Sequence, residues 1–328
     1  MQKITLSDAA DALRAQDNIL ILCHAHPDGD TLGSGYALCR ALLSMGKRAA
    51  VLCADPVPKM FAFLAEGMPE PDFEPDCVVA VDIATLKLMG DSVREKYGER
   101  VDLCIDHHFT NSGYAAAVLL DDKAAAASEI VYRLLQLLGT PITPIIAECL
   151  YVGVSTDTGC FRYSNVTSGT LRIAADLLDL GADTARINRE VFETKSRSFA
   201  KLERMALNSV ETYYDGQYAT VTVTQDMFRE SGAGEDEFDK IAAIPRQIEG
   251  VLVGASIREQ KDGTYKISVR TNPPMNAAEI AAQLGGGGHP AAAGCTLEQS
   301  LEESKKTLRR VVEDALRKAD KIRDGAVK

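Results

Sequence analysis

The sequence contains no tryptophan, and only 5 of its 328 residues are histidine. It also lacks any apolar run that approaches the roughly 20 residues of a membrane-spanning helix. Residues Met1 to Ser7 do not show the basic stretch followed by an apolar stretch that is typical of a secretory signal peptide. We therefore expect a cytoplasmic protein that is neither secreted nor held in a membrane.

Closely spaced cysteine pairs are missing too. Eight cysteines are present, but none of them form a Cys-x-x-Cys motif. Several, including Cys23 and Cys104, lie inside apolar runs. Cysteine is a small and readily buried side chain, and disulfides are rare in reducing compartments. This usage indicates buried, unpaired thiols, as expected in the cytoplasm.

Positive charge is the scarcer sign. The chain has 36 Lys and Arg residues against 47 Asp and Glu residues, which gives a formal net charge of −11. Proteins that coat long nucleic acids depend on many Lys and Arg contacts to phosphates, so this balance argues against that class. A small anionic substrate remains possible, because a bound cation can dominate the field of its site whatever the overall charge.

The pattern of the chain predicts two α/β domains. Residues 1–183 alternate short apolar runs with helical patterns, which predicts a doubly wound, mainly parallel sheet with helices on both faces. Residues 184–211 are mostly charged and helical, and we interpret them as a connector. Residues 212–328 predict a smaller α/β domain with a mixed sheet, in which antiparallel strands within 252–270 turn at Asp262-Gly263.

The individual elements follow from these patterns. The strands expected are 18–23, 49–53, 77–81, 101–105 and 217–223, besides the pair within 252–270. The helices expected are 32–45, 124–138, one starting at Pro144, 167–180, 276–283 and 298–317.

Three of the expected strands are followed by carboxylates and imidazoles. The segments are His24 to Asp30 after Cys23, Asp82 after Val81, and Asp106 to His108 after Ile105. Ligands of parallel sheets bind outside the carboxyl ends of the strands, so these side chains are expected at one edge. A fourth contribution, Asp157, follows the helix that starts at Pro144.

So many carboxylates in one place would repel one another, and divalent cations remove this cost. Asp and His ligands without a thiolate favour manganese, iron or zinc over calcium, and manganese suits a carboxylate-rich site. Each segment alone has an ordinary interpretation, because Asp28 to Asp30 can be a turn and a histidine after a strand is often structural. Four of the five histidines fall in two of these segments, however, and this combination predicts a metal site.

A run of four glycines, 285–288, precedes the fifth histidine, His289. Such a run is typical of a flexible linker. The histidine and the small residues that follow it favour another interpretation, in which backbone N–H groups approach a phosphate closely. No Gly-Lys-Ser/Thr follows, so the run is not a P-loop. The Gly33-Ser34-Gly35 segment matches a dinucleotide fingerprint only weakly, because Leu38 stands at the third glycine position.

Taken together, these segments resemble the DHH phosphoesterase superfamily over nearly the whole chain. The matching segments are His24-x-His26-Pro27-Asp28-x-Asp30-x-x-Gly33-Ser34, Asp82, Asp106-His107-His108 and Asp157-Thr158-Gly159-x-Phe161. The glycine run with His289, followed by Ala292-Ala293-Gly294, resembles the DHH-associated C-terminal domain. Size and domain content are most similar to the branch of nanoRNases and pAp phosphatases (NrnA-like).

The resemblance implies two Mn²⁺ ions, with Mg²⁺, Fe²⁺ or Zn²⁺ less favoured. One ion would be held by His24, Asp28 and Asp82, and the other by Asp30, Asp82, His107 and Asp157. Asp106 would support this arrangement, and His108 would face the scissile phosphate as a catalytic residue beside Asp82 and Asp106. Arg270, His289 and the N–H groups of Gly286, Gly287 and Gly288 would bind the far side of the substrate. His26 lies outside this ligand set and is left in a supporting or structural position.

The expected chemistry is two-metal hydrolysis. Cations roughly 3.5–4 Å apart lower the pKa of a water molecule and stabilise charge on phosphorus. The preferred substrates are short oligoribonucleotides, with 3′-phosphoadenosine 5′-phosphate as a further one, bound in a cleft that closes between the domains and excludes long duplexes. The resemblance also implies a homodimer.

Several alternatives stay open. A phosphodiesterase for cyclic di-AMP or linear dinucleotides would present the same phosphodiester to the same metals. A catalytically inactive nucleotide sensor is a candidate of a different class, although the ligand residues are all present. A RecJ-type exonuclease and a family pyrophosphatase are disfavoured, the first by the acidic charge and the second by the glycine-rich segment.

Overall fold

The structure, a computed structural model, describes residues 2–234 and 237–326 and consists of two compact units, Met1–Thr194 and Lys195–Lys328. The division falls inside the segment 184–211 that the sequence predicts as a connector. This segment forms α7 (Thr184–Asn188), a π-turn (Arg189–Glu193) and α8 (Arg197–Asn208). Within the described ranges, no helix has both the length and the apolar character needed to cross a bilayer.

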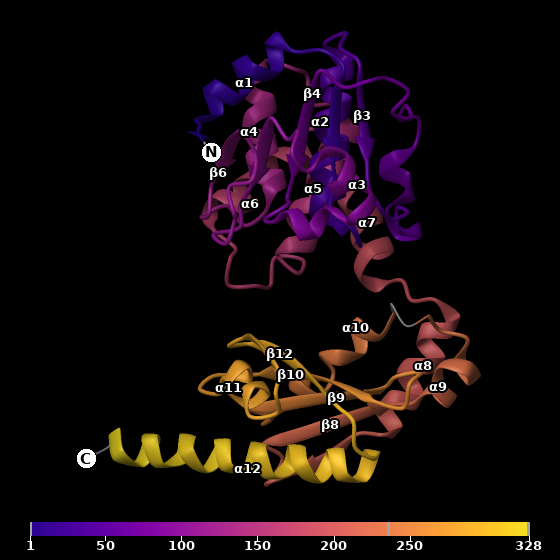
Figure 1. Ribbon diagram of the computed structural model, residues 1–328, viewed down its shortest axis with the longest axis vertical. Helices are drawn as coiled ribbons and strands as arrows, with labels where there is room; N and C mark the ends of the chain where they lie inside the picture. Colours follow the sequence, from indigo (N-terminus) through magenta and orange to yellow (C-terminus); the bar gives the residue numbers. More distant parts are fainter. Residues whose placement is uncertain (1, 235–236, 327–328) are drawn as a thin grey trace. The chain divides into compact units, whose positions relative to one another are not determined.

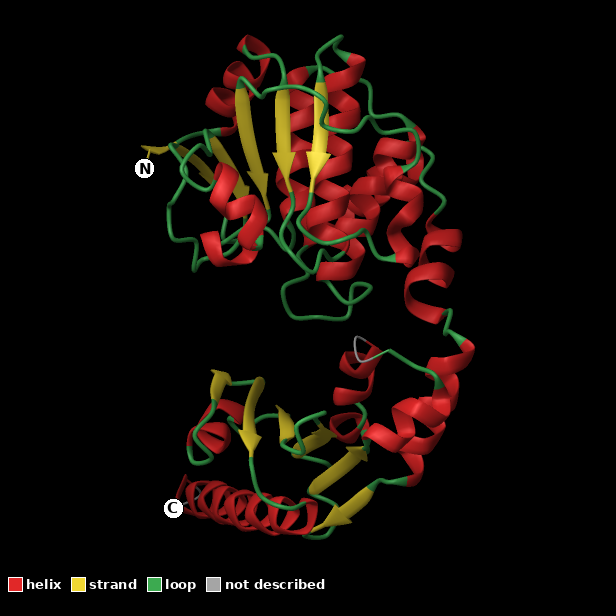
Figure 2. Ribbon diagram, turned by 45° about the vertical axis from the view of Figure 1, so that its right-hand side comes forward, coloured by secondary structure: helices red, strands yellow, loops and turns green. Residues whose placement is uncertain are grey.

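The first unit is built on a six-stranded sheet in which every strand pair is parallel (Figure 2). In spatial order the strands are β1 (Gln2–Lys3), β6 (Ala117–Leu120), β5 (Leu103–Asp106), β4 (Cys77–Val81), β2 (Ile19–Leu22) and β3 (Ala49–Leu52). Strands β5, β4 and β2 are neighbours, so their carboxyl ends lie side by side. The parallel α/β sheet predicted for this part of the chain is confirmed.

Helices cover both faces of this sheet, as the apolar strands require (Figure 1). Ile19 and Ile21 belong to one core, Leu20 and Leu22 to the other. The larger core includes α1 (Leu6–Ala15), α2 (Gly29–Ser44), α4 (Ala127–Leu138), α5 (Pro144–Asp157) and α6 (Ser168–Asp179). The smaller core contains α3 (Asp91–Tyr97) and the 3-10 turn Leu86–Met89.

Helices α2 and α5 pack closely because glycines face each other at their contact. A Cβ atom on Gly33 would overlap the carbonyl oxygen of Cys149 and lie 2.9 Å from the backbone nitrogen of Gly153. A Cβ atom on Gly153 would lie 2.6 Å from the Asp30 carboxylate. Gly33 therefore serves helix packing, and Gly33-Ser34-Gly35 needs no dinucleotide to explain it.

The second unit contains a mixed six-stranded sheet, as predicted. In spatial order its strands are β11 (Gly287–His289), β12 (Ala292–Leu297), β10 (Tyr265–Thr271), β9 (Val253–Glu259), β8 (Tyr218–Val223) and β7 (Glu211–Tyr213). Among the described strands of this second sheet, only β8 and β9 pair in parallel, and the other pairs are antiparallel. One core includes α11 (Ala277–Ala282) and α12 (Leu301–Ala326); the other includes α8, α9 (Gln225–Ser231) and α10 (Phe238–Ala242).

Some element boundaries differ from the predictions. The helix expected at 32–45 begins at Gly29, because the Asp28 side chain accepts the N–H groups of Asp30 and Thr31 and caps the helix there. The closing helix runs over 301–326 instead of 298–317. Strands β1, β6, β7, β11 and β12 were not among the expected strands. They are short or glycine- and alanine-rich, so only pairing with a neighbour defines them.

Candidate metal centre

His24 begins the loop between β2 and α2, and its ring is turned toward two carboxylates. Nδ1 of His24 lies 2.8 Å from the carbonyl oxygen of Ala25, which can only accept a hydrogen bond. Nδ1 therefore carries a proton, and Nε2 is directed to Asp28 Oδ1 at 3.4 Å and Asp82 Oδ2 at 3.7 Å. A backbone carbonyl that holds one ring nitrogen in this way orients the other for a metal ion.

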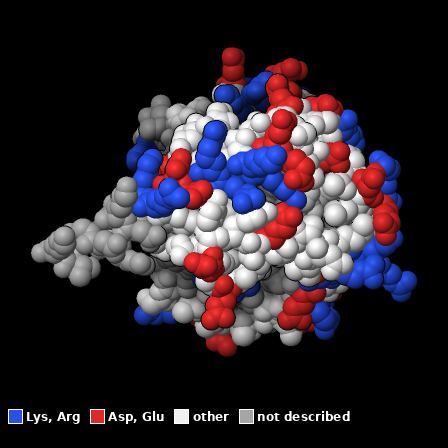
Figure 3. All heavy atoms as spheres, turned by 90° about the horizontal axis from the view of Figure 1, so that it is seen from below, with Lys and Arg blue, Asp and Glu red and all other residues white. Residues whose placement is uncertain are grey.

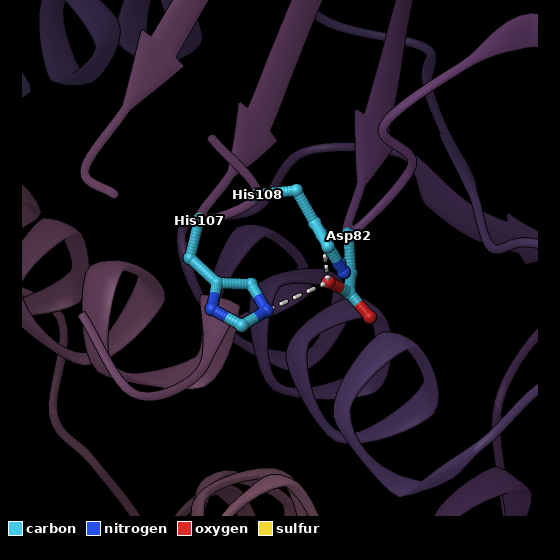
Figure 4. Close-up of side chains that lie close together, drawn as sticks. All are labelled: Asp82, His107 and His108. Atoms are coloured by element: carbon cyan, nitrogen blue, oxygen red, sulfur yellow. Dashed lines mark ion pairs between the residues drawn. The ribbon is translucent and has the colours of Figure 1, made fainter. Parts of the chain in front are cut away.

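Asp82 directly follows β4 in a left-handed backbone conformation, with a φ of 58°, and is 3% exposed. Its Oδ1 lies 3.4 Å from Nε2 of His107 and 3.4 Å from Nδ1 of His108. Figure 4 shows both imidazole rings beside this carboxylate. Asp82 thus lies between the side chains that follow β2 and those that follow β5.

His107, Asp30 and Asp157 form the other side of the centre. Nδ1 of His107 lies 3.2 Å from the carbonyl oxygen of Ala124, which again directs Nε2 inward. Nε2 is 3.3 Å from Asp157 Oδ2 and 3.9 Å from Asp30 Oδ2. Asp157 is the last residue of α5 rather than part of a following loop.

The buried carboxylate of Asp30 is held by the start of α4. It accepts the backbone N–H groups of Ala127 at 2.6 Å and Ser128 at 3.0 Å. The first N–H groups of a helix have no carbonyl partner within their own helix, and the N–H groups of Ala127 and Ser128 are of this kind in α4. The first turn of α2 and the first turn of α4 are therefore locked together at the centre.

Three groups of these side chains have ligand atoms within 4.8 Å of one another: His24, Asp28 and Asp82; Asp30, His107 and Asp157; and Asp82, His107 and His108. The first group is the first ligand set that the resemblance implies, and the second group contains the second set without Asp82. The role of both groups in binding stays a prediction. In the third group, Nδ1 of His108 is already bonded to Asp106 Oδ1 at 2.8 Å. His108 is therefore a poor ligand.

The electrostatics of the centre favour bound cations. In the described ranges, only histidines form ion pairs with Asp28, Asp82 and Asp157, and no lysine or arginine does. Burial and the neighbouring Asp30 raise the pKa of Asp82 well above its ordinary value. The same two causes raise the pKa of Asp157 to about 7. Without a cation, these acids would hold protons that ordinary carboxylates lose.

Two buried atoms of the centre have no hydrogen-bond partner among the described residues: Oδ1 of Asp82 and Nε2 of His107. Leaving buried polar atoms without a partner costs about 1–3 kcal/mol each. Both are atoms of the kind that divalent transition metals bind. The residues present therefore fit one divalent cation in each of the first two groups, with Asp82 between them.

Asp106 orients His108 rather than facing the open side of the centre. The buried carboxylate accepts the backbone N–H of His107 at 2.8 Å and the ring Nδ1–H of His108 at 2.8 Å. Its second oxygen accepts the side-chain N–H of Asn111 at 2.6 Å. The hydrogen bond that His108 donates to the Asp106 carboxylate is the main reason why the pKa of His108 is raised. Asn111 was not anticipated, although its place five residues after Asp106 is a usable signal.

His26 takes no part in the centre. Its side chain is 95% exposed, and the residue contacts Asp55 through its backbone N–H and its ring. His26 has a left-handed backbone conformation, with a φ of 50°.

In the second unit, Arg270 and His289 lie in one row across three strands. Arg270 of β10 pairs with Ala292 of β12, and Ala292 pairs with His289 of β11. Directly paired residues point to the same face of a sheet. Ala293, the next residue of β12, belongs to the core on the other face. The row therefore lies away from α11 and α12, with the small side chain of Ala292 between two basic ones.

The glycine run forms an edge strand and is not a linker. A Cβ atom on Gly288 would lie 2.6 Å from Cα of Ala293, and one on Gly286 would lie 2.5 Å from Cβ of Cys295. Glycine is needed at these positions so that β11 can approach β12. The use of these N–H groups for a phosphate stays a prediction.

Known proteins are similar to this chain in both sequence and fold. Residues 18–154 match the model of the DHH family, N-terminal domain, and residues 215–318 match the DHHA1 domain. A protein of Thermus thermophilus, named bifunctional oligoribonuclease and PAP phosphatase NrnA, is 34% identical over 94% of each chain. The chain belongs to the DHH family.

Two further similar proteins also cover most of the chain. A probable bifunctional oligoribonuclease and PAP phosphatase NrnA of Streptococcus mutans is 30% identical over 89% of this chain and 93% of its own. The crystal structure of an exopolyphosphatase-related protein from Bacteroides fragilis is 25% identical and has a TM-score of 0.83, covering 94% of this chain and 95% of that one. The two-unit fold is thus shared along the full length.

Proposed function

We propose that the chain is a phosphoesterase that hydrolyses short oligoribonucleotides and 3′-phosphoadenosine 5′-phosphate with two divalent cations, preferably Mn²⁺. The observation that carries the proposal is the pair of ligand groups, of which one contains Asp82 and the other contains His107, whose Nε2 lies 3.4 Å from Asp82 Oδ1. The names of the two NrnA relatives support the substrates, because this chain spans nearly the whole of each.

Each group at the centre has a separate task in the proposed reaction. When bound, divalent cations supply charge that activates water for attack and neutralises the phosphate. The residues that would hold them are His24, Asp28, Asp30, Asp82, His107 and Asp157. His108, whose pKa is raised, keeps a proton on Nε2 while Asp106 accepts the Nδ1–H. That proton can be donated to a phosphoryl oxygen or to the leaving oxygen.

The proposal extends to the second unit, residues 212–328 in the predicted division of the chain. Arg270 supplies the positive charge of a phosphate site, His289 adds a ring N–H donor, and the backbone N–H groups of Gly286, Gly287 and Gly288 add further donors. Residues 1–183 then carry the chemistry, and residues 184–211 connect the two.

A turnover panel tests the function. Purified protein is assayed with Mn²⁺ or Mg²⁺ on 3′-phosphoadenosine 5′-phosphate, di- to pentanucleotides, cyclic di-AMP, pyrophosphate and a 24-mer RNA. We expect the short oligonucleotides and 3′-phosphoadenosine 5′-phosphate to be the best substrates, with more turnover in Mn²⁺. Preference for cyclic di-AMP would support the alternative phosphodiesterase, and metal binding without any turnover would support a sensor.

The Asp82→Asn variant tests the centre itself. Asp82 is a member of the group with His24 and Asp28, and its Oδ1 lies 3.4 Å from Nε2 of His107 in the other group. Its loss should therefore reduce kcat on a dinucleotide by a factor on the order of 1,000 and lower the bound metal measured by mass spectrometry. Asp91→Asn, on the exposed side of α3, is the matched control and should behave as wild type. Near-normal rates and metal content in Asp82→Asn would refute the ligand assignment.

A further inference from the structure

A cavity of about 230 Å³ lies in the first unit, apart from the metal ligands. Its wall includes the rings of Pro56, Pro69 and Pro71 together with Val57 and Met68. A water molecule occupies only about 30 Å³ in the liquid, so this space is large enough for a flat organic ring. The mixture of apolar walls with a few polar groups is typical of a small-molecule site.

The polar group that points to a ligand is Tyr36 of α2. This residue lines the cavity, is 7% exposed, and its hydroxyl has no hydrogen-bond partner within residues 2–234 and 237–326. Burial raises the pKa of Tyr36, and the nearby Cys53 and Glu70, which also line the cavity, add to the effect. The hydroxyl oxygen is not among the fully enclosed polar atoms of the described residues that lack a partner, so it is accessible and can bond to an occupant of the cavity.

The lining of the cavity adjoins the loop that carries His24. Leu52 and Cys53, which line it, stand at the carboxyl end of β3, and β3 pairs with β2, whose end carries His24. The Cys53 thiol donates to the carbonyl oxygen of His24 at 3.0 Å. The lining of the cavity is therefore in direct contact with the segment that carries His24.

The acidic groups of the lining define the chemistry of the occupant. Glu70 has no ion pair or hydrogen bond to its side chain among the described residues, and neither has Oδ1 of Asp55. Carboxylates only accept hydrogen bonds, whereas a tyrosine hydroxyl both donates and accepts. They would repel a phosphate and attract N–H groups. An occupant therefore needs a planar apolar body with an amino group at its edge.

We propose that this cavity binds the nucleobase of the nucleotide whose phosphate lies at the metal centre, and that Tyr36 and Glu70 select bases with an exocyclic amino group. The inference rests on the proposed function and deepens it by assigning the base. Adenine presents an amino donor beside a ring acceptor, and cytosine presents an amino donor. Uracil has a carbonyl in the place of that amino group, and its oxygen faces the Glu70 carboxylate without a proton between them.

Nucleosides test the cavity without any phosphate chemistry. Adenosine and uridine are titrated into the metal-free protein, and their dissociation constants are measured from NMR chemical-shift changes. We expect adenosine to bind at least about fivefold more tightly than uridine, the effect of about one added hydrogen bond. Equal affinity for the two nucleosides would overturn the proposal.

Two variants test the residues. Tyr36→Phe and Glu70→Gln should each weaken adenosine binding about fivefold to tenfold and change uridine binding by less than about twofold. Tyr97→Phe, a buried tyrosine of α3 on the other face of the sheet, and Glu66→Gln, in the same stretch as Glu70 but outside the lining, are the matched controls. Unchanged adenosine affinity in Glu70→Gln, which is exposed and keeps the fold, would contradict the assignment even if Tyr36→Phe failed to fold.

The outcome for the cavity is separable from the outcome for the function. If adenosine is preferred but no phosphoester is hydrolysed, the proposed function fails while the cavity remains a base site. If short oligonucleotides are hydrolysed but both nucleosides bind alike, the base site fails and the function remains. With Mn²⁺ present, the KM of a diadenosine dinucleotide should rise in both variants more than that of a diuridine one.

Discussion

At the scale of single residues, the centre separates side chains that bind from side chains that orient. Asp82 Oδ1 and His107 Nε2 are buried without a partner in the described chain, so they are open to a cation. Asp106 lies one residue away from His107, yet hydrogen bonds occupy both of its oxygens. Neighbouring acids in one motif therefore have different chemistry, and the hydrogen bonds decide which is which.

The Asp106→Asn variant should change the pH profile of the reaction. Asp106 raises the pKa of His108, and the proposed acid is the protonated His108. Loss of the carboxylate charge lowers that pKa, so the alkaline limb of the kcat profile should move to lower pH. We expect kcat at neutral pH to fall about 10- to 100-fold, a typical cost of losing a group that orients a catalytic one.

This experiment needs pH-rate profiles of wild type, Asp106→Asn and Asp91→Asn with the same dinucleotide. A profile of Asp106→Asn that keeps its alkaline limb while kcat drops would show that Asp106 acts on structure alone.

At the scale of elements, the centre depends on how closely α2 approaches α5. Gly33 and Gly153 allow the two helices to touch, and this contact brings Asp30 near Asp157 at the end of α5. The candidate metal ligands Asp30 of α2 and Asp157 of α5 are therefore placed by a packing contact rather than by a loop.

Gly33→Ala should destabilise the first unit. The added methyl group overlaps the Cys149 carbonyl, and overpacking of this kind costs about 1–3 kcal/mol of unfolding free energy. Urea unfolding followed by circular dichroism measures the change. Gly169→Ala, at a helical position whose nearest atom would be 3.3 Å away, is the control and should be close to neutral. Equal stability of both variants would show that α2 and α5 can separate without cost.

A prediction at the same scale concerns the row of Arg270, Ala292 and His289 on the second sheet. His289→Ala removes one of the two basic side chains beside Ala292, so the KM of a dinucleotide should rise about tenfold while kcat changes little. Steady-state kinetics measure both constants. Lys266→Ala, an exposed residue on the same strand and face as Arg270, is the control. A drop in kcat at unchanged KM would place His289 in the chemical step instead.

At the scale of the whole molecule, the acidic character of the chain is compatible with a site built around cations. On the face that Figure 3 shows, Lys and Arg residues lie among Asp and Glu residues. The net charge of −11 repels a polyanion from a distance, while cations bound at the proposed centre would attract a short one locally.

The metal-free protein should lose stability as the pH rises. In the folded state, burial and Asp30 raise the pKa of Asp157 from 3.8 to about 7. For His24, burial lowers the pKa, but the hydrogen bond and charge of Asp28 outweigh it, and the pKa rises from 6.5 to about 9. Both groups bind more protons folded than unfolded, so their stabilisation is complete below the unfolded pKa and lost as the pH rises through the folded one.

Urea unfolding with EDTA should therefore give a lower unfolding free energy at pH 8.5 than at pH 5.5. Added Mn²⁺ replaces these protons, so its stabilising effect should be larger at the higher pH. Asp157→Asn should show a weaker loss between these two values. A metal-free protein that gains stability on going from pH 5.5 to 8.5 would contradict the arrangement of charges.

The sequence by itself determined the parallel sheet of the first unit, the mixed sheet of the second, and the strand ends that carry the acids and imidazoles. Apolar runs such as Cys77–Val81 define a buried strand locally, and whatever follows such a run must lie at the carboxyl edge. For this reason the sequence alone places Asp82 and His107 together at the carboxyl edge of the sheet.

Tertiary structure alone decided the rest. Which of His24 and His26 faces the acids is decided in the folded loop, where His26 has a φ of 50° and contacts Asp55 instead. Asp157 reaches the centre through the contact of α5 with α2. Strands such as β11 exist only because a neighbour pairs with them. The cavity beside Tyr36 is formed by segments that contact one another only in the folded chain. Local sequence encodes periodicity and hydrogen-bonding capacity, whereas these features depend on distances between residues far apart in the chain.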